Sequence, residues 1–364
     1  MLDRMISRRE VLIGAGAAAI SPWKFWRQTE AAKSVGWAIL GLGSYATNQI
    51  MPAFASCKHS KLVALISGHP EKLTRFGDKY GIAAASRYAY DTMDEIRHNA
   101  EIDVVYVITP PATHPNFVIR VANLGKHVCS EKPMAPTVAE CQSMIDACRK
   151  AGRLLQIGYR CHYENHNLAA VKAVRSGELG KIQSFKSDHG FNMPDGLWRT
   201  QKALAGGGSM MDIGIYSLNA LRYLTGEEPT SVSAKITNPP NDHRFIDVED
   251  TVDFSLNFPS GAVGQGTSGY SWVIGKNRYE VVGDKGILHA EPATPYDGHR
   301  FTIDGKEMLV EANNQFAAQL DHMSEHVRTG KPVLTPGEEG LRDIRIIQAI
   351  YESAKTGQPV SLRA

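Results

Sequence analysis

Asp212 and Tyr216 form the clearest chemical pair in the sequence. They lie four positions apart in the stretch Gly206–Tyr216, whose glycines lead into an expected helix, so both side chains fall on one helix face about one turn apart. A carboxylate beside a phenol can direct a proton. The same pattern also fits a glycine-rich turn before a core helix, with the Tyr216 hydroxyl satisfied by the protein. The spacing leaves both interpretations open.

Lys132 is a second residue that could take part in chemistry. It stands in Glu131-Lys132-Pro133, directly after an expected strand, and open α/β sheets bind their ligands at the carboxyl ends of strands. The alternative is a surface lysine before a helix, because Pro133 suits the first helical turn.

A glycine turn precedes these residues in the chain. The segment Gly41-Leu42-Gly43-Ser44-Tyr45-Ala46 lies between an expected strand at 36–40 and another at 61–67. The G-x-G-x-x-A match is weak by itself, but its position between two strands predicts a dinucleotide site. Gly41 would allow the tight turn, and Gly43 would let the main chain approach a pyrophosphate at the helix N-terminus.

The end of the second strand predicts the cofactor type. Ser67 follows the strand, with Lys72 and Arg75 nearby, and no acidic residue closes the strand to bind a ribose hydroxyl. A hydroxyl with a cation suits a 2′-phosphate, so we predict NADP. Lys72 and Arg75 could instead belong to the solvated side of a helix.

Strand and helix patterns alternate up to about residue 159, which is typical of a parallel α/β sheet. The remaining patterns of this part are a strand at 103–108, its exit loop at 109–114, a helix to about 124, a strand at 126–130, a helix at 137–151 and a strand at 154–159.

Later strands follow one another without helices, which indicates an antiparallel sheet. They are expected at 182–187, 230–236, 251–258, 262–267, 279–282 and 286–290, before two terminal helices at about 315–329 and 337–356. A length of 364 residues favours two domains. We therefore predict an α/β N-terminal Rossmann domain at 33–158 and an α+β C-terminal domain with a large, mostly antiparallel sheet at 159–364.

The composition of the chain limits the kinds of ligand that it is expected to bind. The net charge is +2 and no long basic block follows residue 33, so we expect small-molecule ligands and no nucleic acid. The five cysteines, at 57, 129, 141, 148 and 161, show no paired framework and no close metal-ligand spacing. We predict buried thiols and no metal site.

The N-terminus resembles an export signal. Arg8 and Arg9 precede the apolar run Val11–Ile20, which is too short to span a bilayer but suits a signal peptide. Paired arginines suggest twin-arginine export to the periplasm, without stable membrane insertion. The alternative is an ordinary basic terminus. We assign residues 1–32 to the signal and an arm. Residues 23–34 could form an arm that covers the adenine or a partner subunit, and they could equally well be a solvated linker.

Taken together, the motifs resemble the glucose-fructose oxidoreductase, inositol dehydrogenase and rhizopine-catabolism (Gfo/Idh/MocA) superfamily, and specifically its exported glucose-fructose oxidoreductase branch. The resemblance extends over nearly everything from Val35 onward. It rests on G-L-G-x-Y, S-G-x-x-x-K, E-K-P, the segment 158–163 (G-Y-R-C-H-Y), the string 206–216 and the segment 312–316 (A-N-N-Q-F).

The resemblance implies a sugar site between the two domains and an open-faced second sheet that forms a homodimer or homotetramer. It predicts Lys132, Asp212 and Tyr216 as catalytic residues, with Tyr216 where many relatives carry a histidine. The predicted substrate residues are Lys132, Arg160, Tyr163, Asp212, Tyr216 and Tyr296. The predicted cofactor residues are Gly41, Gly43, Ser44, Tyr45, Ser67, Lys72, Thr109, Pro110, His114, Glu131, Arg160, Trp198 and Arg199.

The implied activity is a sugar oxidoreductase with tightly bound NADP(H), which oxidises an aldose at C1 to the lactone and reduces a second sugar to an alditol in ping-pong fashion. Tyr216 would be the acid/base, with Lys132 favouring its ionised form. Ser44 stands where the glucose-fructose enzyme has a lysine, and two loops look shorter than in that enzyme. The acceptor could therefore be an aldose instead of a ketose. Alternatives are a cofactor-releasing NADP-dependent sugar or cyclitol dehydrogenase and a non-catalytic NADP or sugar sensor.

Overall fold

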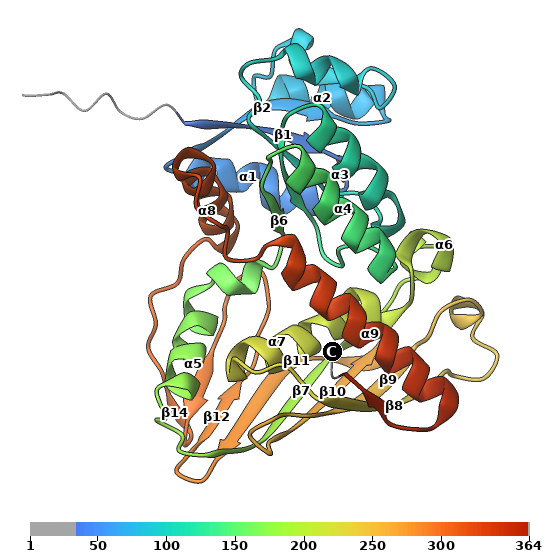
Figure 1. Ribbon diagram of the computed structural model, residues 1–364, viewed down its shortest axis with the longest axis vertical. Coiled ribbons are helices and arrows are strands. Elements are labelled where there is room, and N and C mark those ends of the chain that lie inside the picture. The colour runs from blue at the N-terminus through green and yellow to red at the C-terminus, as the bar shows by residue number, and fades with distance from the viewer. Residues whose placement is uncertain (1–33, 363–364) are drawn as a thin grey trace, which may run out of the picture. The chain divides into compact units, whose positions relative to one another are not determined.

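The computed structural model describes residues 34–362 of the chain. The predicted export signal and most of the predicted arm therefore lie outside the described residues. The described part contains two sheets, one of six strands and one of nine, with helices packed against each (Figure 1).

The first sheet is parallel throughout, with the strand order β3-β2-β1-β4-β5-β6. Its strands are β1 (Val35–Leu40), β2 (Ser60–Ile66), β3 (Arg87–Tyr88), β4 (Val104–Val107), β5 (His127–Ser130) and β6 (Leu155–Ile157). All residues of β1 and β4 are buried, as apolar runs covered by helices on both faces must be. The order reverses between β1 and β4, and such a switch point is where Rossmann folds bind ligands. The prediction of a Rossmann domain is confirmed.

Short helices connect these strands. They are α1 (Met51–Ala53), α2 (Pro70–Lys79), α3 (His114–Asn123) and α4 (Val138–Lys150). Thr137 is the N-cap of α4, because its hydroxyl oxygen accepts a hydrogen bond from the Glu140 amide. The same hydroxyl donates to the Glu140 carboxylate at 2.7 Å. The helix therefore starts six residues after Lys132, at Val138, and Pro133 is not in its first turn.

The second sheet has the strand order β14-β13-β12-β11-β7-β10-β9-β8-β15. Its strands are β7 (Ile182–Asn192), β8 (Ser231–Thr237), β9 (Thr251–Asn257), β10 (Val263–Gly269), β11 (Ser271–Gly283), β12 (Ile287–Ala290), β13 (Phe301–Ile303), β14 (Lys306–Glu307) and β15 (Val360–Ser361). Only the β7–β10 pair is parallel among the described pairings of this sheet. The predicted mostly antiparallel sheet is confirmed.

One face of this sheet is buried and the other is polar and exposed. Phe185, Ser187 and His189 of β7 are buried, whereas Lys186 between them and Gln265 on the adjacent β10 are exposed. The period of two along each strand separates the faces. The outer face is therefore open, as the resemblance implied.

The remaining helices are α5 (Asn165–Arg175), α6 (Lys202–Ala205), α7 (Ile215–Thr225), α8 (Gln315–Thr329) and α9 (Gly337–Thr356). Helix α7 lies against the buried face of the second sheet (Figure 1). Helix α8 instead packs on the first sheet, where Phe316 and Leu320 share a core with Trp37, and Trp37 Nε1 donates to Ser324 Oγ at 2.9 Å. Helix α8, near the end of the chain, thus completes the core of the N-terminal domain.

Three local features differ from the expectation. The predicted strand at 279–282 is only the end of β11, which pairs irregularly with β7 between Ser271 and Lys276. Helix α5 was not predicted. Residues Met210–Gly214 form a π-helical turn before α7, so Asp212 and Tyr216 do not share the regular α-helical spacing that the sequence pattern suggested.

All five cysteines are free thiols; four are buried and Cys57 is half-buried. Within residues 34–362, no group of three or more metal-ligating side chains could hold a metal ion. Of the helices that the structure describes, none is both long and apolar enough to cross a membrane.

Candidate active site

A cavity of about 720 Å³ lies where the carboxyl ends of the first sheet face the second sheet. Most of the predicted site residues line it. They are Gly41, Gly43, Ser44, Tyr45, Ser67, Lys72, Thr109, Pro110, Glu131, Lys132, Arg160, Trp198, Arg199, Asp212, Tyr216 and Tyr296.

The glycine turn after β1 has the shape that a dinucleotide needs. Gly41 has φ +96°, and a Cβ there would lie 2.3 Å from the Ile108 carbonyl oxygen, so only glycine fits. A Cβ at Gly43 would meet nothing within 4 Å, which leaves open space in front of the helix that starts at Ser44. A pyrophosphate fits this position, because helix N-termini offer free amide groups and a positive partial charge.

Ser67, His69 and Lys72 line the cavity beyond β2. The Ser67 hydroxyl accepts a hydrogen bond from the His69 amide at 3.2 Å. A hydroxyl and an ammonium group suit the 2′-phosphate of NADP. The lining residues directly at the end of β2, by contrast, include no carboxylate that could bind a free ribose hydroxyl. The geometry therefore fits NADP.

Lys132 and Asp212 meet at the centre of the cavity. Lys132 Nζ donates to the Asp212 main-chain oxygen at 2.6 Å and lies 3.5 Å from Asp212 Oδ1. Asp212 Oδ2 lies 3.1 Å from Arg199 Nε and accepts a hydrogen bond from the Tyr270 hydroxyl at 2.7 Å. Burial alone would raise the pKa of Asp212, but Lys132 and Arg199 more than offset it and hold the pKa below its usual value. The carboxylate is therefore ionised at neutral pH.

Tyr216 is surrounded by cations and a neutral imidazole. Arg160 Nη2 donates to its hydroxyl oxygen at 3.2 Å, and Lys132 Nζ lies 4.5 Å from its ring centre. His189 stacks on the ring with centres 5.8 Å apart, and burial lowers the pKa of His189 to about 3. Because the hydroxyl oxygen accepts from Arg160, its own proton is left to donate to a ligand.

Glu131 lines the cavity with a largely buried side chain and accepts a hydrogen bond from the Tyr106 hydroxyl. Burial raises the pKa of Glu131. On the opposite side, Arg199 lies over the ring of Trp198 at 4.6 Å, and this pair borders the apolar lining formed by Phe191, Met193 and Leu197.

Two predicted residues, His114 and Tyr163, are not among those that line the cavity. The His114 ring is fully buried and lies 2.7 Å from the Thr109 carbonyl oxygen and 3.2 Å from that of Met134. The Tyr163 hydroxyl bonds Thr335 Oγ1 at 2.9 Å inside the core. The His114 ring thus bonds the main chain and the Tyr163 hydroxyl bonds a buried side chain, so direct contact of His114 with the cofactor and of Tyr163 with the substrate is not supported.

Other residues of the site were missed from the sequence. Asn277 and Thr294 line the cavity, and the Thr294 amide and hydroxyl both donate to Asn277 Oδ1, at 2.7 and 2.9 Å. Tyr270 holds Asp212 from the second sheet. Asn277 lies within β11, Tyr270 lies between β10 and β11, and Thr294 lies in an irregular loop. No local motif marks any of them.

Comparison with known proteins identifies both domains. A family model described as "Oxidoreductase family, NAD-binding Rossmann fold" matches residues 35–159, and one described as "GFO/IDH/MocA C-terminal domain" matches residues 167–289. The crystal structure of aldose-aldose oxidoreductase from Caulobacter crescentus complexed with glycerol is 52% identical, covering 91% of this chain and 100% of that one, with a TM-score of 0.88.

More distant relatives include named dehydrogenases. D-xylose 1-dehydrogenase [NADP(+)] from Haloarcula marismortui is 28% identical over 92% of this chain and 95% of that protein. scyllo-Inositol 2-dehydrogenase (NAD(+)) from Bacillus subtilis is 26% identical over 89% of this chain and 95% of that protein.

Proposed function

The chain belongs to the Gfo/Idh/MocA oxidoreductase family, and we propose that it oxidises an aldose at C1 to the lactone and reduces a second sugar to an alditol. The observation that carries this proposal is the Tyr216 hydroxyl, which lies beside Arg160 and Lys132 in the same cavity as the glycine turn. The 52% identity to an aldose-aldose oxidoreductase supports an aldose as substrate.

Tyr216 is the proposed acid/base. As the phenolate, it accepts the proton of the C1 hydroxyl group while the C1 hydrogen leaves with its electron pair; as the resulting phenol, it returns that proton when the second sugar is reduced. NADP, held by the Gly41–Tyr45 turn with Ser67 and Lys72, would supply the hydride acceptor. Lys132 and Arg160 stabilise negative charge on the oxygen atoms, while Asp212 orients Lys132.

The proposal includes periplasmic location after twin-arginine export and tight retention of NADP(H). A periplasmic enzyme has no free nicotinamide pool, so two half-reactions in one site, with ping-pong kinetics, remove the need for one. Twin-arginine export moves folded chains, which allows cofactor loading beforehand. The exposed polar face of the second sheet is the proposed surface for a homodimer or homotetramer.

Product analysis tests this function directly. The purified full-length protein is incubated with single aldoses, without added nucleotide, and the products are identified by mass spectrometry. The proposal expects lactone, or its hydrolysed acid, and alditol in equal amounts over many turnovers. Product formation that stops after one turnover and resumes only with added NADP would instead favour a cofactor-releasing sugar dehydrogenase, the second candidate, which the name of the Haloarcula relative supports.

A further inference from the structure

Residues 293–299, hereafter the 293–299 segment, form one wall of the cavity. The segment lies between β12 and β13 and has no regular secondary structure, yet it places Thr294, Pro295 and Tyr296 in the cavity lining. A segment without a hydrogen-bonded ladder needs other partners to keep its position.

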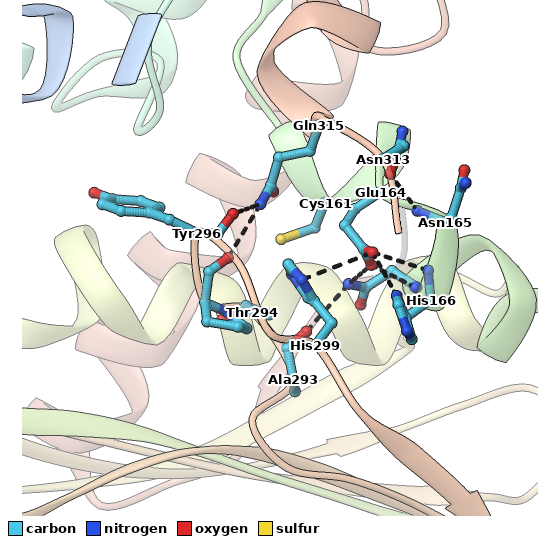
Figure 2. Close-up of polar contacts among 12 residues, drawn as sticks. Cys161, Glu164, Asn165, His166, Ala293, Thr294, Tyr296, His299, Asn313 and Gln315 are labelled. Atoms are coloured by element: carbon cyan, nitrogen blue, oxygen red, sulfur yellow. Dashed lines mark hydrogen bonds and ion pairs between the residues drawn. The ribbon is translucent and has the colours of Figure 1, made fainter. Parts of the chain in front are cut away.

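Buried side chains from outside the segment provide these partners. Four consecutive carbonyl groups, those of residues 293–296, accept hydrogen bonds from three side chains that are at most 4% exposed. The bonds are Asn167 Nδ2 to Ala293 (3.1 Å), Arg160 Nη2 to Thr294 (2.7 Å), Arg160 Nη1 to Pro295 (2.8 Å), Gln315 Nε2 to Pro295 (3.2 Å) and Gln315 Nε2 to Tyr296 (2.7 Å). Figure 2 shows the two bonds from Gln315 to the segment.

Arg160 connects the segment to the acid/base residue. The guanidinium group that binds the segment also donates to the Tyr216 hydroxyl at 3.2 Å, and it lies 5.0 Å from the Tyr216 ring centre and 4.9 Å from the Tyr296 ring centre. Gln315 Oε1 accepts a further bond from Arg160 Nη1 at 2.7 Å. Gln315 therefore bonds both the segment and the cation that contacts Tyr216.

The far end of the segment is held near the start of α5. His299 Nδ1 lies 3.7 Å from Glu164 Oε1, and Glu164 caps α5 by accepting from the amides of His166 and Asn167. Figure 2 shows Glu164 between His166 and His299. Asn167, which binds Ala293, belongs to the same helix turn, so both ends of the segment are tied to one element.

The geometry around Gln315 is set by the neighbouring residues of the segment 312–316. Asn314 Oδ1 accepts hydrogen bonds from the amides of Phe316 and Ala317 and so begins α8. Asn313 bonds the Asn165 amide at 3.0 Å and the Tyr163 carbonyl at 2.9 Å. These bonds fix Gln315 at the first position of α8, pointing toward the cavity wall.

We propose that Gln315 is a positioning residue for the sugar, acting through the 293–299 segment and through Arg160. It sets the position of Thr294 and Tyr296 for substrate binding and that of Arg160 for stabilising charge at Tyr216. The inference rests on the proposed function for its sugar substrate, whereas the placement of the segment can be measured without any sugar.

Two variants separate the loss of the hydrogen bonds of Gln315 from a change of charge beside Arg160. Gln315→Asn shortens the reach of the amide without adding charge, so the segment loses its donor and Arg160 loses one of its four oxygen partners. Gln315→Glu keeps an acceptor for Arg160, removes the donor and places a negative charge beside the guanidinium group. Gln358→Glu, at an exposed position after α9, is the matched control for the charge change.

Hydrogen exchange of the peptide 291–300 and steady-state kinetics with an aldose are then compared. Both variants are expected to exchange at least about tenfold faster in this peptide and to raise KM about tenfold, because one lost hydrogen bond corresponds to about that factor. Gln315→Asn should leave kcat within about threefold of wild type. Gln315→Glu should lower kcat about tenfold further, because the new carboxylate offsets the charge of Arg160.

Unchanged exchange of the peptide in both variants overturns the proposal, as does faster exchange with an unchanged KM. If Gln315→Glu does not fold, Gln315→Asn alone decides between these results. A wild-type protein that turns over no aldose contradicts the proposed function, and the exchange measurement then still decides whether Gln315 holds the segment.

Discussion

Two polar clusters meet at Tyr216, and they balance charge differently. The Asp212 cluster comprises Asp212, Lys132, Arg199 and Tyr270. The Arg160 cluster comprises Arg160, Tyr216, Tyr296 and Gln315. The first pairs an ionised carboxylate with two cations, whereas the second surrounds a buried guanidinium group with neutral oxygen atoms.

This difference assigns separate tasks to the clusters. A cation whose partners are neutral keeps its full field for a negative charge that forms nearby, so Arg160 suits the developing charge on Tyr216. Lys132 is already partly compensated by Asp212, so the first cluster is better suited to orienting groups. Substitutions in each cluster test this division of tasks.

Tyr216→Phe removes the only proposed proton carrier of the Arg160 cluster. We expect kcat to fall at least ~100-fold, the usual size of an acid-base contribution, while the fold is retained because the ring still packs. Tyr80→Phe, at the end of α2 and outside the cavity lining, is the control. Steady-state kinetics measure kcat of both variants. Near-normal turnover in Tyr216→Phe would exclude Tyr216 from the mechanism.

Tyr270→Phe breaks the Asp212 cluster at its neutral member. The variant removes a buried hydrogen bond to a carboxylate, so we expect the free energy of unfolding to fall by about 2 kcal/mol. Denaturant titration measures this change. A loss below about 0.5 kcal/mol, within the range of ordinary surface substitutions, would show that Lys132 and Arg199 hold Asp212 without it.

Lys132→Met tests the charge balance of the Asp212 cluster through the pH dependence of the free energy of unfolding. In the wild type the pKa of Asp212 is lowered, so its ionisation stabilises the fold above its unfolded pKa and this stability is lost as pH falls through the folded value. Without Lys132, burial should raise that pKa. The wild type should therefore gain stability over the variant as pH rises from about 3 to about 7, by about 1.4 kcal/mol for each unit of pKa difference.

Denaturant titrations across this pH range provide the measurement. Lys79→Met, at an exposed position on α2, should give a difference from wild type that does not change with pH. The same flat profile for Lys132→Met would contradict the proposed coupling between Lys132 and Asp212.

Lys72→Ala tests the cofactor end of the cavity, away from both clusters. Loss of one partly exposed charge-assisted bond should weaken NADP binding about fivefold and leave NAD binding unchanged. Calorimetric titration of cofactor-free protein with each nucleotide compares the two. Equal weakening of both nucleotides would place Lys72 away from the 2′-phosphate.

The sequence predicted elements well where local signals mark their ends. Helix α8 was predicted at its observed bounds, since Asn314 caps its start and Gly330 ends it in a left-handed conformation. The Gly41 turn was likewise predicted, because only glycine tolerates its φ value. Fold class and family are confirmed.

The partners of the site residues were harder to predict, because they come from distant parts of the chain. Asp212 was expected to face Tyr216, but a π-helical turn intervenes, and its carboxylate contacts Arg199 and Tyr270. Arg160 lines the cavity as expected, but the sequence did not predict that its Nη1 and Nη2 groups bind protein oxygen atoms. Tertiary packing decides such contacts, and no local pattern encodes them.

Retention of NADP(H) through both half-reactions can be followed in the absorbance spectrum of the purified full-length protein before and after an aldose is added without nucleotide. We expect bound nicotinamide whose reduced-form absorbance rises with a single aldose and decays as alditol forms, with no nucleotide released into the filtrate. Protein that carries no nucleotide, and that reacts with an aldose only while NADP is supplied and consumed in equal amount, would contradict this expectation.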